Sequence, residues 1–65
     1  MPEAWTGALV GKMHNAEVTY EELAAEIGCG KSYLSMVLNG KRKPKDAENR
    51  FNAAFARVIE KRNGG

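Results

Sequence analysis

The hydrophobic residues of the chain recur mostly at intervals of three and four, and polar residues fill the positions between them. That spacing places apolar side chains on one face of an α-helix. No stretch alternates apolar and polar residues over the length of a β-strand, so we expect no sheet. The pattern predicts a compact all-α bundle whose four helices span residues 3–14, 20–27, 31–38 and 45–61. Residues 45–50 are a candidate for a fifth, separate helix.

The first predicted helix begins at Glu3 or Thr6 and ends near His14. The residues before it, 1–3, are expected to be loose. Apolar side chains at three- and four-residue spacing define its inner face. That face consists of Trp5, Ala8, Leu9, Lys12 and Met13, with the three large apolar residues at its centre.

The second predicted helix has a clear beginning. Thr19 and Glu22 have the spacing of a capping box, in which each side chain accepts a hydrogen bond from the other residue's backbone. Val18 before the cap and Leu23 after it have the spacing of a hydrophobic staple. Gly28 follows the last turn, where a left-handed residue is favoured. The buried face is predicted to consist of Leu23, Ala24 and Ile27.

The third predicted helix has an apolar arc and a polar arc when its residues are laid out at about 100° per residue. The arc expected to face the core holds Tyr33, Leu34, Val37 and Leu38. The opposite arc, expected to be free for a partner, holds Lys31, Ser32, Ser35 and Met36. Asn39 and Gly40 end the helix, because both residues tolerate positive φ.

Only Gly28, Cys29 and Gly30 separate the second helix from the third. A short turn that contains glycine joins two helices at a steep angle. The small side chain of Ala24 allows the two helices to approach closely, and Cys29 is expected to be a buried apolar residue in the turn. Residues 19–40 are therefore predicted to form a helix-turn-helix.

The last predicted helix follows Pro44, which disfavours helical geometry at the residue before it. Asp46 and Glu48 are expected in its first turn and Lys61 and Arg62 in its last, as the helix dipole favours. Its apolar stripe consists of Phe51, Ala54, Phe55, Val58 and Ile59. We expect this stripe to cover the core, and a dimer seam is the alternative.

The net charge is only +2, but the charged residues are unevenly distributed. Residues 17–26 carry four glutamates and no basic residue, whereas residues 31–45 carry five basic residues and no acidic one. A basic segment on one side of a domain is typical of phosphate binding. A solvated surface loop is the alternative that charge alone leaves open. The position of the basic segment beside the polar arc of the third helix favours nucleic acid.

Length and composition favour a single small domain that spans residues 1–65. The single Cys allows no internal disulfide. The sequence has no apolar run long enough to cross a membrane and no signal-peptide pattern. We therefore expect a cytoplasmic protein that is stabilised by packing alone.

Candidate chemistry is sparse. Residues 25–32, AEIGCGKS, approach the phosphate-loop pattern, but Ala25 replaces its first glycine and no strand precedes it. His14 has no second His or nearby Cys with which to bind a metal, and Cys29 has no His partner to activate it. We expect no enzyme, no cofactor and no metal site.

Residues 19–40 resemble the helix-turn-helix of the lambda-repressor-like family, the Cro and phage-repressor type. The matching positions are Leu23, Ala24, Ile27, Gly28, Cys29, Leu34 and Val37, followed by Asn39, Gly40 and Lys41. The resemblance implies a transcriptional regulator that binds double-stranded DNA in a bacterial or phage-infected cell. Most relatives bind as dimers, and here we expect a weak or DNA-dependent homodimer.

The resemblance places the third helix in the major groove of DNA. Base contacts are expected from Lys31, Ser32, Ser35 and Met36. Lys31 is the strongest candidate, because its ammonium group donates to guanine O6 or N7. By position in the family, phosphate contacts are expected from Thr19, Tyr20, Asn39, Lys41, Arg42 and Lys43. Tyr33 lies at the rim of the outward arc, and two roles are possible for it, contact of its hydroxyl group with a phosphate or packing of its ring.

Three residues depart from the family pattern. Gly30 stands where Ser or Thr usually caps the third helix, Leu38 stands where Glu is common, and Met36 replaces a frequent polar base reader. The rival hypothesis is a protein-binding module that uses the same face, with Met36, Leu38 and Tyr33 as its apolar contacts. Residues 41–44, which we call the basic loop, follow the third helix and favour DNA over this rival.

Overall fold

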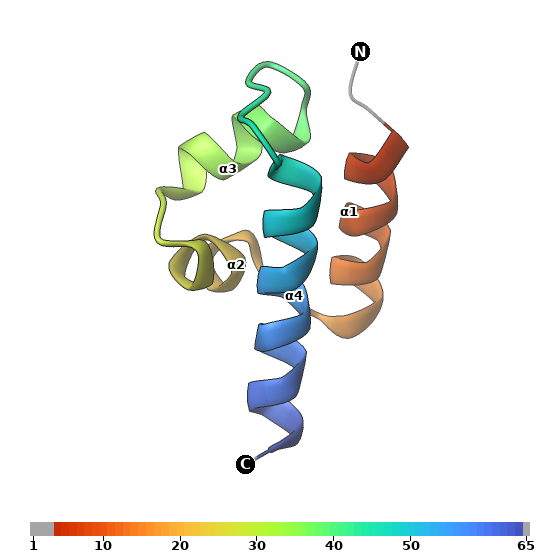
Figure 1. Ribbon diagram of the computed structural model, residues 1–65. Coiled ribbons are helices and arrows are strands. Elements are labelled where there is room, and N and C mark those ends of the chain that lie inside the picture. The colour runs from red at the N-terminus through yellow and green to blue at the C-terminus, as the bar shows by residue number, and fades with distance from the viewer. Residues whose placement is uncertain (1–3, 65) are drawn as a thin grey trace.

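The computed structural model describes residues 4–64 and contains four helices (Figure 1). In chain order they are α1 (Ala4–Ala16), α2 (Tyr20–Ile27), α3 (Lys31–Leu38) and α4 (Ala47–Asn63). No strand occurs in this part of the chain, and the all-α prediction is confirmed. Residues 47–50 belong to α4, so they form no fifth helix. The expectations for residues 1–3 lie outside the described residues.

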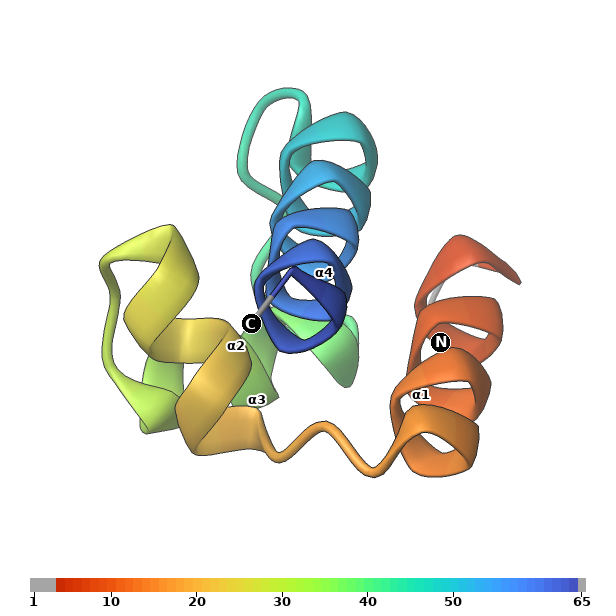
Figure 2. The same cartoon turned by 90° about the horizontal axis from the view of Figure 1, so that it is seen from below.

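α4 is the longest helix and occupies the middle of the molecule. Figure 2 looks along it and shows α1 on one side and α2 on the other, with α3 behind α4. α4 packs against α1 and α2, whereas α3 packs against α2 and α1. The loop between α3 and α4 lies at the same end of the molecule as the beginning of α1 (Figure 1).

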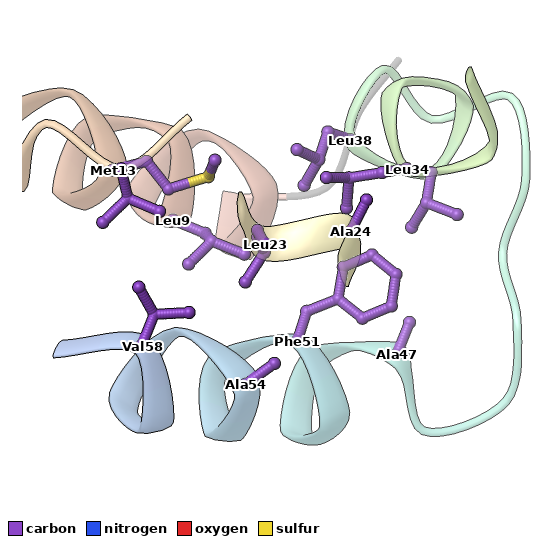
Figure 3. Close-up of a cluster of buried hydrophobic side chains, with 12 residues drawn as sticks. Leu9, Met13, Leu23, Ala24, Leu34, Leu38, Ala47, Phe51, Ala54 and Val58 are labelled. Carbon is purple, nitrogen blue, oxygen red and sulfur yellow. The ribbon is translucent and has the colours of Figure 1, made fainter. Parts of the chain in front are cut away.

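The helices meet in one core of buried apolar side chains (Figure 3). Its buried members are Leu9, Met13, Val18, Leu23, Ala24, Leu34, Val37, Leu38, Ala47, Phe51, Ala54 and Val58. The Phe51 ring points from α4 toward Ala24 of α2. Trp5 meets this ring edge-on, with the ring centroids 5.9 Å apart and the planes at 89°. Every helix therefore contributes apolar surface to the same core.

The apolar stripe of α4 lies against this core. Phe51, Ala54 and Val58 are buried, and Phe55 and Ile59 are half-buried and packed against the buried cluster. Burial of apolar area is the main favourable term in folding. The stripe is thus used within the chain, which supports the expectation of a core lid over that of a dimer seam.

The inner face of α1 differs from the prediction at its flanks. Thr6 is buried, whereas Ala8 and Lys12 are exposed. Lys12 lies over the Phe55 ring, with its Nζ 5.4 Å from the centroid, and donates a hydrogen bond to Asn52 Oδ1 at 2.9 Å. A long lysine stem covers apolar surface while its charge stays in water. A search for apolar spacing alone overlooks a buried threonine.

α1 ends in a Schellman motif that places Glu17 in the left-handed region. The Glu17 amide donates to His14 O at 3.2 Å, and the Val18 amide donates to Met13 O at 2.9 Å. Glu17 has φ 58°, a conformation in which glycine is favoured. The helix continues to Ala16, two residues beyond the predicted end near His14. Val18 follows and is buried in the core.

The predicted start of α2 is confirmed. The Glu22 amide donates to Thr19 Oγ1 at 3.1 Å, and the Thr19 amide donates to Glu22 Oε1 at 3.2 Å, which completes the capping box. Val18 and Leu23, the two residues of the predicted staple, are both buried. Ala24 is buried beside them. Local sequence signals therefore determine where this helix begins and which face it buries.

α4 begins later than predicted, at Ala47, because Lys45 and Asp46 form a turn. Asp46 has φ 60°, so it cannot belong to the right-handed helix that follows. Its carboxylate accepts a hydrogen bond from Asn49 Nδ2 at 2.8 Å instead of capping a backbone amide. Of the two acidic residues predicted in the first turn, only Glu48 lies there.

Charged side chains of α2 and α4 form a polar layer beside the core. Glu26 accepts hydrogen bonds from Lys61 Nζ at 2.6 Å and from Arg57 Nε at 2.9 Å. Its side chain is only 14% exposed. The bonds from Lys61 and Arg57 favour the ionised carboxylate and therefore hold the pKa of Glu26 below its ordinary value.

Arg62, in the last turn of α4, joins three points of the chain. Its guanidinium donates to Ala16 O at 2.6 Å, to Glu17 O at 2.9 Å and to Glu22 Oε1 at 2.6 Å. The first two acceptors are carbonyls at the end of α1, which have no partner within that helix. Arg62 therefore connects the end of α1 and the start of α2 to the end of α4.

We predict that Glu17→Gly raises the free energy of unfolding by about 1 kcal/mol, because glycine adopts the left-handed conformation without a Cβ penalty. Urea unfolding followed by far-UV circular dichroism would measure this. The matched control is Ala8→Gly, at an exposed helical position, which should lower stability by about 1 kcal/mol. A Glu17→Gly protein no more stable than the parent would contradict the strain assigned to this position.

Acid should weaken the contact between α2 and α4. Because the pKa of Glu26 is lowered in the folded protein, its carboxylate adds stability above the ordinary pKa, and this is lost as the pH falls through the lowered value. Glu26→Gln should destabilise the protein at neutral pH and reduce the further loss between about pH 5 and pH 2. Urea unfolding across this range measures both effects.

A second substitution, at Arg57, tests whether the effect of Glu26 depends on its ion pair with α4. In the Glu26→Gln background, Arg57→Gln should have little further effect at neutral pH. If Glu26→Gln and the parent lose stability in parallel as the pH falls, the ion pairs do not produce the acid dependence.

Candidate nucleic-acid interface

The inward arc of α3 consists of Leu34, Val37 and Leu38, all of which are buried. Tyr33, predicted in the same arc, is 37% exposed, so its assignment to the core is wrong. Tyr33 lies at the margin of the arc, and the three aliphatic side chains fill the contact beneath α3. Its ring and hydroxyl group are therefore available at the rim of the helix.

The outward arc of α3 divides into two parts. Lys31 and Ser32 in the first turn are exposed, whereas Ser35 and Met36 near the end are half-buried. Ser35 Oγ accepts a hydrogen bond from Asn39 Nδ2 at 3.2 Å. The first turn of α3 is therefore the part of the predicted base-reading arc that is most open to a partner.

The turn before α3 depends on Gly28, which has φ 91° and ψ 28°. The amides of Gly28 and Cys29 both donate to Ala24 O, at 2.8 Å and 3.0 Å. Cys29 is half-buried against the core, so it is less enclosed than predicted. The left-handed glycine reverses the chain within three residues and allows α3 to begin at a steep angle to α2.

Gly30 is the N-cap of α3, with φ −79° and ψ 154°, and it provides no side-chain hydrogen bond. The first intrahelical bond of α3 runs from the Leu34 amide to Gly30 O at 3.1 Å. The amides of the preceding helical residues consequently have no carbonyl partner within the helix. The exposed first turn of α3 thus presents backbone donors together with Lys31.

The end of α3 connects directly to the basic loop. The Gly40 amide donates to Val37 O at 3.1 Å and the Lys41 amide donates to Met36 O at 2.8 Å, the two bonds of a Schellman motif. Gly40 has φ 82°, whereas Asn39 has φ −92°. Only the glycine of the predicted Asn-Gly pair therefore uses positive φ.

The basic side chains that follow are on the surface. Lys41, Arg42 and Lys43 are exposed, and the Arg42 amide donates to Met36 O at 3.3 Å. Pro44 is half-buried at the end of this segment. Because backbone bonds fold the start of the loop onto α3, the positive charge begins next to the last turn of that helix.

The start of α2 is the other predicted phosphate-binding region. Thr19 is exposed, but its hydroxyl oxygen accepts the capping hydrogen bond from the Glu22 amide. Tyr20 is half-buried and packs against the core. Of the two residues, Thr19 is therefore the more accessible, while the ring of Tyr20 is used in packing.

The acidic residues of α2 are divided between two faces. Glu22 and Glu26 pair with basic residues of α4, away from α3. Glu21 instead lies beside α3, with its Oε1 3.6 Å from Lys31 Nζ. Sequence spacing could not find this neighbour of Lys31, because the distance depends on the angle between α2 and α3.

The structure therefore contains two short helices of eight residues each, a three-residue turn with a left-handed glycine between them, and an exposed start of α3. Residues 15–48, more than half of the chain, match the helix-turn-helix family HTH_3, the Cro/C1 type. The chain belongs to this family. No curated protein and no solved structure matches the chain. Membership confirms the resemblance to the Cro and phage-repressor type.

Membership of the Cro/C1-type helix-turn-helix family implies DNA binding, in a family that is typically non-enzymatic. The matched span contains α2, α3 and the whole basic loop. Within residues 4–64, no three His, Cys, Asp or Glu side chains gather in a way that could hold a metal ion. None of the helices described is long and apolar enough to cross a membrane.

We predict that Gly30→Ser raises the free energy of unfolding by about 0.5 kcal/mol, because serine caps a helix and restricts the unfolded chain. A Cβ atom at Gly30 would meet no other atom within 4 Å. Thermal unfolding is the measurement. Gly28→Ser is the matched control and should lower stability by about 1 kcal/mol, since φ is positive there. A destabilised Gly30→Ser protein would contradict the cap assignment.

Proposed function

We propose that this helix-turn-helix protein binds double-stranded DNA sequence-specifically and acts as a small transcriptional regulator of the phage or bacterial type. α3 is the recognition helix and lies in the major groove. One observation carries the proposal: the exposed first turn of α3 belongs to the same helix whose last turn is hydrogen-bonded to the basic loop. The protein acts in the cytoplasm of a bacterial or phage-infected cell.

The proposed base contacts come from the outward arc of α3. Lys31 donates to guanine O6 or N7, and Ser32 donates to or accepts from a base edge. Both side chains are exposed at the start of the helix, which enters the groove first. Ser35 and Met36 are half-buried, so less of each side chain is accessible to a base. Met36 contacts a thymine methyl group.

The proposed phosphate contacts flank this helix on both sides. Lys41, Arg42 and Lys43 contact the backbone after α3, and Asn39 lies beside them. Thr19 and Tyr20 contact it at the start of α2, and Tyr33 offers its hydroxyl group at the rim. Phosphate contacts position a protein on the duplex without reading its sequence. The loop therefore supplies affinity and register, whereas α3 supplies specificity.

The rival protein-binding module has less support in the structure. It requires apolar side chains on the outer face of α3, but Leu38 is 4% exposed and Met36 is half-buried. Tyr33 is the remaining exposed member of that set. A single exposed aromatic side chain that follows an exposed lysine and an exposed serine in the sequence fits a nucleic-acid surface better than an apolar protein interface.

Homodimerisation is proposed to be weak or dependent on DNA. The large apolar residues of α4 are packed into the core of the same chain, and Phe55 and Ile59 are half-buried there. Two copies on adjacent half-sites would then meet only when the duplex holds them together.

The first experiment is a titration of a fluorescent random-sequence duplex with the protein at several salt concentrations between about 50 mM and 200 mM. Binding should weaken linearly on a log–log plot, with a slope of about −0.9 for each phosphate neutralised. Sequence selection from the bound pool then identifies the preferred duplex. No binding at the lowest salt, at tens of micromolar where non-specific binders register, would exclude this function.

We predict that the triple variant Lys41→Ala, Arg42→Ala and Lys43→Ala binds the random duplex roughly a hundredfold more weakly, because three phosphate contacts are lost. The slope of its salt plot should decrease in magnitude by about 2 to 3. The same fluorescence titration measures both quantities, and circular dichroism confirms that the variant is folded.

The control variant, Lys12→Ala and Lys61→Ala, removes two cations that lie outside the proposed interface. Because the net charge changes without a change in the proposed interface, affinity should fall only slightly. If the triple variant binds DNA as tightly as the parent, the loop is not a phosphate-binding element.

A further inference from the structure

Glu21 is the α2 glutamate that lies beside the proposed recognition helix. Its Oε1 is 3.6 Å from Lys31 Nζ. Glu21 is the second residue of α2 and Lys31 is the first residue of α3, so the ion pair joins the first turns of the two helices. The side chain of Glu21 is 77% exposed and that of Lys31 is 62% exposed, so both can meet a partner.

The other two glutamates of α2 have different partners. Glu22 accepts hydrogen bonds from the Thr19 amide and from Arg62, and Glu26 accepts them from α4. These bonds connect α2 to its own cap and to the last helix. Glu21 makes no corresponding contact with α4 among the described residues. Its carboxylate is instead placed at the surface where DNA phosphates would approach.

The fold does not require this ion pair. An ion pair between two exposed side chains contributes little to stability, because water and salt screen it. Its influence is greater in a DNA complex, where water is excluded from the contact and charges interact more strongly. A functional rather than a structural effect is therefore expected from the removal of Glu21.

Glu21 changes what Lys31 can gain from a duplex. A lysine without an acidic neighbour is attracted by every phosphate, because DNA carries a dense and uniform negative charge. A carboxylate 3.6 Å from the ammonium group offsets this attraction. The pair therefore adds little to binding that depends only on charge.

A guanine edge differs from a phosphate because it attracts Lys31 through directional hydrogen bonds and not through net charge. Its O6 and N7 atoms accept hydrogen bonds at fixed positions in the major groove. The ammonium group has three donors, so Lys31 can bond to guanine and keep Glu21 as a neighbour. An interaction that disfavours the wrong partners raises specificity as effectively as one that favours the right one.

We infer that Glu21 is a positioning residue that sets the specificity of DNA recognition. It holds Lys31 for a base edge and lowers the affinity of the protein for arbitrary sequence. This inference rests on the proposed function and assigns to the acidic start of α2 a role in the same site.

The test compares the parent with E21Q, K31Q, the double variant E21Q/K31Q and E60Q. Glu60 is an exposed glutamate of α4, so E60Q makes the same change in net charge away from α3. Each protein is titrated with the duplex recovered by sequence selection and with a random-sequence duplex at one salt concentration. The quantity compared is the ratio of the two affinities.

E21Q should bind the random duplex about five- to tenfold more tightly and the selected duplex with nearly unchanged affinity, so the ratio falls by the same factor. E60Q should change the ratio by less than about twofold. In the K31Q background, E21Q should have no further effect on the ratio, because Glu21 acts through Lys31. The thermal unfolding midpoint of E21Q should equal that of the parent, which separates this role from a structural one.

An unchanged ratio in E21Q would overturn the inference, and so would an equal change of the ratio in the K31Q background. Either result leaves the proposed DNA binding intact, since the parent still distinguishes the two duplexes. A parent protein that binds neither duplex, or whose selection recovers no preferred sequence, would overturn both the inference and the proposed function.

Discussion

The placement of α3 depends on the packing of α2 against α4. The Phe51 ring points from α4 toward Ala24, and Leu23 is fully buried in the same core. α3 packs on α2 and α1, so its orientation follows from theirs. Protein cores are close-packed, and a change of one methylene group is transmitted to neighbouring elements. The apolar contact between α2 and α4 thus sets the direction in which the polar arc of α3 points.

The ion pairs between α2 and α4 also explain how a protein of net charge +2 presents a basic surface. The carboxylates of Glu22 and Glu26 lie against Arg62, Arg57 and Lys61, where opposite charges offset each other. Lys41, Arg42 and Lys43, in the loop after α3, are exposed and form no ion pair with a carboxylate of the described residues. The positive charge of this loop is therefore not offset by a paired carboxylate, which favours an oriented approach to a polyanion.

The features of the fold that depend on short-range sequence signals match the predictions made from the sequence. Thr19 and Glu22 form their capping box, Gly28 takes the left-handed position, and the apolar spacing identifies most of the core. The left-handed conformations of Glu17 and Asp46 were not predicted, because neither residue is a glycine. In each case the surrounding chain imposes a conformation that the residue does not favour by itself.

In the candidate site, too, the features that depend on neighbouring residues were predictable, and those that depend on the packing of helices were not. Its polar arc, its glycine turn and its basic loop are visible in the sequence, because each depends on neighbouring residues. The exposure of Tyr33 and the proximity of Glu21 to Lys31 depend on how helices cross, so helical spacing could not indicate them. The contacts of Arg62 with residues forty or more positions away are equally beyond a local pattern.

The glycine cap of α3 has a consequence for motion. α3 has eight residues, no side-chain cap, no acidic residue in its first turn and no basic residue in its last. An isolated helix of that length is unstable in water, so α3 is helical because Leu34, Val37 and Leu38 are held in the core. Its first turn has no side-chain cap, and Lys31, Ser32 and Tyr33 are exposed, so we expect this turn to open more readily than the buried end of the helix. The surface proposed to meet DNA is thus the part of the helix best able to adjust its backbone to a duplex.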